Sequence, residues 1–290
     1  MISFVNSTLG TSNKLTCVSR PRRFGKSFVT KILCAYYDKS CDSKELFVGL
    51  EIEKDPSFEK YLNQYDVIYL DITWFISTCK EGKDVVDYLQ EQIVGELQEF
   101  YPLADKEESL PLMLSKVYKI TGNKFIIIID EWAALFREEK EDFDLQKKYL
   151  QLLRGLFKSS MTDRVIEAAY MTGILPIKKY GTQSAMTDFR EYTMVSPKRL
   201  ATYTGFTEEE VRRLCKIYDI DFGETKKWYD GYSFPKEKSI YNPNAIVQAM
   251  ENGEFGTYWT ETYESGRAEG SAYFDAGRGA LSDGRQKLSE

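Results

Sequence analysis

The fold of this chain is decided by the stretch LTCVSRPRRFGKSFVTKIL, which runs from Leu15 to Leu33. It predicts a short buried strand, then a basic turn that ends in Gly25-Lys26-Ser27, and then an apolar helix. The backbone N–H groups of such a turn and of the helix N-terminus point at one place, and the helix dipole adds partial positive charge there. Gly25 has no Cβ, so an anion can approach its backbone closely. The order of strand, turn and helix therefore predicts a phosphate-binding loop.

The side chains of this loop indicate how a nucleoside triphosphate would be held. Lys26 is spaced to reach the outer phosphates, and the Ser27 hydroxyl is a ligand suited to Mg²⁺. The predicted cofactors are therefore ATP and Mg²⁺. The predicted nucleotide-binding residues are Arg22, Arg23, Phe24, Gly25, Lys26, Ser27 and Phe28.

The loop departs from the usual pattern at Arg20, where a glycine normally stands. Pro21 disfavours a helical conformation of the residue before it, so we expect Arg20 to be extended and the tight turn to begin near Arg22. A Gly-Lys-Ser triplet by itself also occurs in basic surface turns. The interpretation as a phosphate loop therefore depends on a second segment of the chain.

That second segment is KFIIIIDEW, from Lys124 to Trp132. A run of apolar β-formers predicts a parallel strand that is buried on both faces, and Asp130 and Glu131 would stand at its carboxyl end, where open α/β sheets bind ligands. We expect Asp130 to hold Mg²⁺ through water opposite Ser27, and Glu131 to polarise the attacking water. The alternative is a strand that simply leads into a helix N-terminus, where acidic residues are favourable in any case.

The rest of the chain alternates strand and helix patterns. Strands are predicted at 66–73 and 165–172, and amphipathic helices at 85–101 and 144–158, an alternation typical of a parallel α/β sheet. We therefore predict an α/β fold, in which residues 1–200 form a three-layer P-loop NTPase domain with helices on both faces of a parallel sheet.

The character of the sequence changes after this domain. A capping box at Thr207–Glu210 opens a helix, and residues 201–262 are predicted to form a small helical lid. Residues 263–290 contain few aliphatic side chains, so we expect a disordered tail.

Composition excludes several kinds of chemistry. The 290 residues include no histidine, which rules out Ser–His and Cys–His catalysis and histidine metal sites. The net charge of -6 gives no argument for nucleic-acid binding. Five scattered cysteines without metal-ligand spacing indicate reduced, buried thiols and a cytoplasmic protein. No apolar run is long enough to predict a membrane span.

Six motifs of this chain resemble, in sequence and order, those of the AAA-ATPase-like family of anaerobic bacteria. They are Ser19–Ser27, the Ile-Ile-Asp-Glu that ends at Glu131, Thr172-Gly173, Gly205–Glu210, Tyr229–Phe234 and Tyr241–Pro243. The resemblance implies a P-loop ATPase of the additional-strand, catalytic-glutamate class. It implies phosphate and Mg²⁺ roles for Lys26 and Ser27, a Mg²⁺ role for Asp130, a water-activating role for Glu131, and a sensor position beside the γ-phosphate for Thr172.

The chain also departs from this family. The family usually has Asp-Glu-Tyr-Asp, whereas this chain has Asp130-Glu131-Trp132-Ala133, so the last acid is missing. The family's opening segment is mostly missing from this sequence. Family members often carry a C-terminal PD-(D/E)XK nuclease-like domain, which has no counterpart in the 290 residues, so we do not expect nuclease activity of this chain.

Two functions remain open from the sequence. The first is a slow Mg²⁺-dependent ATPase or nucleotide switch, with a transition-state arginine from Arg22, Arg23, Arg190, Arg199 or a neighbouring subunit. The second is a non-hydrolysing scaffold whose lid recruits a protein partner. In either case the expected partners are a nucleotide and a second copy or another protein, without nucleic acid or membrane.

Overall fold

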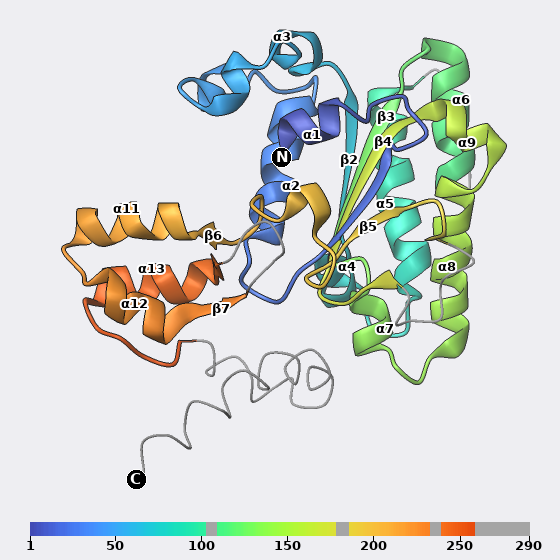
Figure 1. The fold of residues 1–290 in the computed structure, drawn as a ribbon. Helices are drawn as coiled ribbons and strands as arrows, with labels where there is room; N and C mark the ends of the chain where they lie inside the picture. Colours follow the sequence, from blue (N-terminus) through green and yellow to red (C-terminus); the bar gives the residue numbers. More distant parts are fainter. Residues whose placement is uncertain (103–108, 178–185, 233–238, 259–290) are drawn as a thin grey trace. The chain divides into compact units, whose positions relative to one another are not determined.

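A computed structural model describes residues 1–102, 109–177, 186–232 and 239–258 (Figure 1). The chain divides into two compact units. The first consists of Met1–Pro21 and Lys26–Ser196, and the second of Arg22–Gly25 and Pro197–Glu290. The predicted division into domains at residues 200 and 262 stays a prediction, and the predicted disordered tail at 263–290 lies outside the described residues.

The first unit is built on a sheet of five parallel strands in the order β2-β3-β4-β1-β5. Their bounds are Leu15–Ser19 for β1, Asp66–Asp71 for β2, Phe125–Asp130 for β3, Ile166–Gly173 for β4 and Arg190–Tyr192 for β5. Every residue of β1 and of β3 is buried, as the continuous apolar runs predict for strands covered on both faces.

Helices cover both faces of this sheet (Figure 1). One face carries α1 (Ile2–Asn6) and α2 (Lys26–Tyr37), and the other carries α5 (Val85–Phe100), α6 (Leu110–Thr121), α8 (Phe143–Phe157) and α9 (Ser160–Val165). The short helix α4 (Ile72–Thr78) follows directly on β2, α7 (Ala134–Glu138) begins after a three-residue turn that follows β3, and the two helices pack against each other. Further short elements of the described residues are 3₁₀ turns at Lys44–Phe47 and Glu51–Lys54 and helix α3 (Phe58–Tyr61). The predicted three-layer α/β fold is confirmed.

The second unit contains helices and a small sheet. Its helices are α11 (Glu208–Tyr218), α12 (Phe222–Tyr229) and α13 (Pro243–Asn252), after a 3₁₀ turn at Lys198–Leu200. The predicted capping box is confirmed, because the Thr207 side chain accepts from the Glu210 N–H and the Glu210 carboxylate accepts from the Thr207 N–H. The antiparallel strands β6 (Phe206–Thr207), β8 (Ile240–Tyr241) and β7 (Asp230–Tyr232) were not predicted, because two or three residues give no readable alternation.

One expectation about the cysteines is wrong. Cys17 in β1 and Cys215 in α11 are buried, but Cys41 is exposed. Cys41 lies in the loop after α2, next to apolar segments in the sequence without packing against them in the fold. No disulfide joins the cysteines of the described residues, and all five are free thiols.

Candidate nucleotide-binding site

Four of the predicted site residues, Lys26, Asp130, Glu131 and Thr172, lie together at one edge of the parallel sheet. Ser19 at the end of β1 is paired with Gly173 at the end of β4, and Ile129 in β3 is paired with Met171 in β4. This register brings the carboxyl ends of the three strands to the same edge, which is where open α/β sheets bind ligands. The loops that carry the candidate residues leave from there.

The phosphate loop begins as the sequence predicts. The backbone N–H of Arg20 still donates to the carbonyl of Gly173, at 3.0 Å, so Arg20 continues the ladder beyond β1. Its side chain is fully buried and donates to the carbonyls of Ser19 and Tyr192, at 2.9 Å each. The turn starts at Arg22. Arg20 therefore builds the base of the loop instead of facing a ligand.

Lys26 is the first residue of α2 and is almost completely buried, with 5% of its surface exposed. Its ammonium donates to the Pro21 carbonyl at 3.1 Å and forms an ion pair with Oε1 of Glu131 at 3.2 Å. Burial lowers the pKa of Lys26 below its ordinary value, and the Glu131 carboxylate opposes that effect. The loop thus holds a desolvated cation, which is favourable for an anionic ligand.

Glu131 has an uncommon backbone conformation. Its φ is 49°, in the left-handed region that only a few non-glycine residues occupy. Three hydrogen bonds hold it there: its N–H donates to Oδ1 of Asp130 at 3.1 Å and to Oγ1 of Thr172 at 3.3 Å, and the Trp132 N–H donates to the Thr172 carbonyl at 2.9 Å. Such strain is concentrated at functional sites. The left-handed conformation of Glu131 directs its carboxylate towards Lys26.

Asp130 and Thr172 form the floor of the site. Asp130 ends β3 and is 3% exposed, and the fully buried Thr172 hydroxyl donates to its Oδ1. The bond fixes the orientation of the Asp130 carboxylate. Thr172, which was predicted to sit beside a γ-phosphate, therefore contacts the predicted Mg²⁺ acid in this structure.

A further cation, Arg137 of α7, belongs to this cluster and was not among the predicted site residues. Its guanidinium donates to Oε2 of Glu131 at 3.1 Å, and its side chain is only 14% exposed. The one available signal was a lone basic residue after the apolar run Trp132–Phe136. The sequence gives no reason to separate it from an ordinary surface charge.

Several other predicted residues lie at the surface of their own unit. Arg22, Arg23, Ser27 and Phe28 are exposed, and so are Arg190 and Arg199. Arg23 and Gly25 both have positive φ, 65° and 77°. Nothing within 4 Å would meet a Cβ on Gly25, so its backbone is open to a ligand. Phe24 is buried, and within the second unit its ring meets Tyr232 edge-on at 5.2 Å.

The residues present suit Mg²⁺ chemically. Ser27 supplies an exposed hydroxyl and Asp130 a fixed carboxylate, and both are hard oxygen ligands. Within the described residues no three acidic or cysteine side chains are grouped to hold a metal by themselves. Mg²⁺ usually keeps several waters and binds through one or two protein oxygens and substrate phosphates. The donor set fits that mode of binding.

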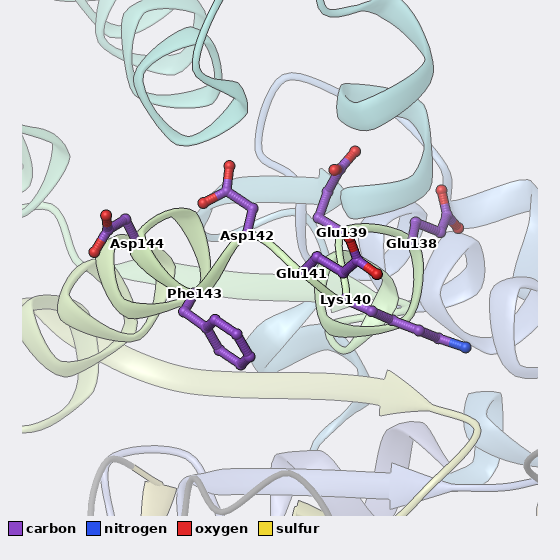
Figure 2. A pocket seen from close by; sticks show the side chains of 7 residues that line it. All are labelled: Glu138, Glu139, Lys140, Glu141, Asp142, Phe143 and Asp144. Carbon is purple, nitrogen blue, oxygen red and sulfur yellow. The ribbon is translucent and has the colours of Figure 1, made fainter.

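One pocket of the described residues lies elsewhere in the first unit. It has a volume of about 700 Å³ and is lined by Glu138, Glu139, Lys140, Glu141, Asp142, Phe143 and Asp144, between α7 and α8 (Figure 2). Five of these seven side chains are carboxylates, which repel phosphate. This pocket is therefore no candidate for the triphosphate.

The parallel sheet with helices on both faces defines a P-loop protein of the ATPase-like class. Residues 3–182 match the model of the AAA-ATPase-like family, described as "Predicted AAA-ATPase". The chain belongs to this family.

Comparison with individual proteins gives more distant similarity. An uncharacterized protein in the vnfD 5'region of Azotobacter chroococcum mcd 1 is 22% identical over 251 residues, which are 84% of this chain and 46% of that protein. The chain thus spans about half the length of this curated relative.

Solved structures that resemble the chain do so with low TM-scores. Domain III of the Thermotoga maritima replication initiation protein DnaA has a TM-score of 0.40 at 11% identity, covering 89% of this chain and 85% of that one. The Aeropyrum pernix ORC2 protein has a TM-score of 0.35 at 9% identity, covering 90% and 67%. Separately, no helix among the described residues has the length and apolar character to cross a membrane.

Proposed function

We propose that this chain binds ATP together with Mg²⁺ and hydrolyses it slowly. The observation that carries the proposal is the buried ion pair between Lys26 of the phosphate loop and Glu131 at the end of β3, 3.2 Å apart. A nearly buried ammonium at the start of a helix, with an open glycine backbone before it, is suited to a ligand of high negative charge.

Each residue then has a defined part. Lys26 and the backbone N–H groups of the loop bind the phosphates, while Ser27 and Asp130 supply oxygen ligands for Mg²⁺, which would neutralise phosphate charge. Thr172 holds Asp130 in place through its hydroxyl. Glu131 orients the attacking water. Phosphoryl transfer depends mainly on positioning and charge stabilisation, so these few groups suffice.

The proposal is tested with Glu131→Gln and Lys26→Met, both close in shape to the parent residues. We expect Glu131→Gln to keep ATP affinity, or to gain a few-fold because Lys26 loses its competing partner, while phosphate release falls by about 10²-fold or more. Lys26→Met should lose at least about tenfold in affinity, since a hydrogen-bonded charge contact is removed. Calorimetry and a phosphate-release assay, each with and without Mg²⁺, measure both quantities. Equal phosphate release by the parent and Glu131→Gln would contradict hydrolysis.

A second function, ATP binding without turnover, is favoured by one observation. Both oxygens of Glu131 are engaged by cations, Oε1 by Lys26 and Oε2 by Arg137. A carboxylate held in this way is not free to act on water. In that case the chain works as a nucleotide-dependent scaffold for a second copy or another protein, and the parent would bind ATP with the same background turnover as Glu131→Gln.

A further inference from the structure

The Glu131 carboxylate is shared between two cations of different kinds. Lys26 lies 3.2 Å from Oε1, and Nη1 of Arg137 lies 3.1 Å from Oε2. The side chains of Lys26, Arg137 and Glu131 are 4%, 14% and 19% exposed, so water screens these contacts only weakly. The first cation belongs to the phosphate loop, and the second belongs to α7.

ATP cannot bind without disturbing this arrangement. Lys26 has to turn its ammonium to the phosphates, and it then loses or weakens its contact with Glu131. An unpaired carboxylate close to a triphosphate would be strongly unfavourable. Once Lys26 turns to the phosphates, the site therefore needs another group that holds the Glu131 carboxylate and keeps it away from Lys26.

We propose that Arg137 is this positioning residue: it retains the Glu131 carboxylate and so releases Lys26 for the phosphates. The inference rests on the proposed nucleotide binding and adds to it a residue whose effect passes through Glu131. Arg137 acts on the position of the carboxylate and makes no contact with ATP.

The structure around Arg137 suits this role. Helix α7 begins three residues after Glu131, and the Ala134 N–H donates to the Glu131 carbonyl at 2.8 Å. Buried Trp132 and Phe136, in edge contact at 5.9 Å, anchor the helix in the core. The planar guanidinium presents several hydrogen-bond donors in a fixed arrangement. The anchored helix thus keeps Arg137 within reach of the Glu131 carboxylate.

A cycle of four full-length proteins tests the inference: the parent, Arg137→Met, Glu131→Gln and the double variant. Methionine keeps much of the apolar stem of arginine and removes the charge. We expect Arg137→Met to weaken Mg-ATP affinity by about tenfold in the parent, because Glu131 then stays on Lys26. In the Glu131→Gln background the same change should cost less than about twofold, since no carboxylate is left to compete.

Other outcomes overturn the inference. An equal loss of affinity in both backgrounds would mean that Arg137 contacts the phosphates itself, and no loss in either would mean that the ion pair only stabilises α7. A parent that binds no ATP overturns the proposed function, and this inference with it, whereas a parent that binds without coupling between the two positions overturns the inference alone.

Two further variants control the experiment. Arg137→Lys keeps the charge without the planar fork, so it should lose less affinity than Arg137→Met, and it replaces that variant in the cycle if the methionine protein does not fold. Glu138→Gln removes a second carboxylate near Arg137, whose Oε1 lies 3.6 Å from Nη2 and whose side chain is 40% exposed. Its ATP affinity should stay within about twofold of the parent, since exposed ion pairs contribute little.

Discussion

At the scale of one residue, the backbone conformation of Glu131 determines where its carboxylate lies. A φ of 49° is costly for a residue with a Cβ, and the hydrogen bonds of Asp130, Trp132 and Thr172 offset that cost. The strained turn places the carboxylate between Lys26 and Arg137. A relaxed turn at the end of β3 would point the side chain elsewhere.

Gly173 supports this turn because its missing side chain leaves room for the Trp132 ring. A Cβ at Gly173 would lie 2.7 Å from Nε1 and 2.9 Å from Cδ1 of Trp132, whose ring is fully buried. We therefore expect Gly173→Ala to lower the free energy of unfolding by about 1–3 kcal/mol, as overpacking in a core does. Denaturant unfolding of the full chain measures this change.

Gly95 provides the matched control. It lies inside α5, and nothing within 4 Å would meet its Cβ. Gly95→Ala should stabilise the chain by about 0.5–1 kcal/mol, because alanine is the better helix former. A Gly173→Ala protein as stable as Gly95→Ala would show that Trp132 can move aside, and the tight contact would then not support the turn.

At the scale of elements, Glu208 joins two helices of the second unit. It lies in the first turn of α11 and accepts from Nη2 of Arg212 at 2.7 Å and from the ammonium of Lys226, in α12, at 2.6 Å. The hydrogen bonds from Lys226 and then Arg212 lower the pKa of Glu208 to about 2. A carboxylate with a lowered pKa stabilises the folded state above its unfolded pKa, and this contribution is lost as the pH falls towards the folded pKa.

The lowered pKa of Glu208 determines how the stability of Glu208→Gln should depend on pH. At pH 7 we expect the variant to be less stable than the parent by about 1 kcal/mol or less, since the group is partly exposed. The difference should shrink as the pH falls from about 4.5 to about 2. Denaturant unfolding of the parent and the variant at several pH values measures this difference in stability.

Glu209→Gln is the control for the helix dipole, because Glu209 lies in the same first turn and is exposed. It should show only the dipole contribution of a few tenths of a kcal/mol. If the two variants had the same pH profile, the contacts with Arg212 and Lys226 would have no measurable effect on stability.

At the scale of the whole molecule, the net charge of -6 opposes ATP, so binding depends on local cations. Arg22 and Arg23 are exposed on the phosphate loop, and exposed charges are screened within about 8–10 Å at physiological ionic strength. We expect ATP affinity to fall as salt rises. The double variant Arg22→Ala/Arg23→Ala should bind several-fold more weakly at low salt and respond less to salt, as titrations at two salt concentrations would reveal.

Lys119→Ala/Lys147→Ala changes the net charge by the same amount and serves as the control. Both lysines are exposed, on α6 and α8, which cover the face of the sheet opposite α2 (Figure 1). The ATP affinity of this lysine double variant should stay close to that of the parent. If this variant lost as much affinity as the arginine variant, total charge would explain the effect, and if neither lost any, backbone N–H groups alone would hold the phosphates.

The sequence by itself determined the α/β fold, the order of strand, turn and helix around Gly25–Ser27, the position of Asp130 and Glu131 at the end of a buried strand, and the capping box at Thr207. These features are local. Apolar runs, helical periodicity and the restriction that Pro21 places on Arg20 act over a few residues, so they can be read without knowing which segments meet.

Only the tertiary structure decided how the site is connected. The contact of Thr172 with Asp130 spans 42 positions, and the burial of Arg20 depends on β5. Arg137 stands six residues after Glu131, yet its contact with that carboxylate requires the strained turn and the anchoring of α7. The small sheet of β6, β7 and β8 likewise pairs segments too short to predict. Hydrogen bonds and ion pairs between distant segments depend on how the chain packs, and no local pattern encodes them.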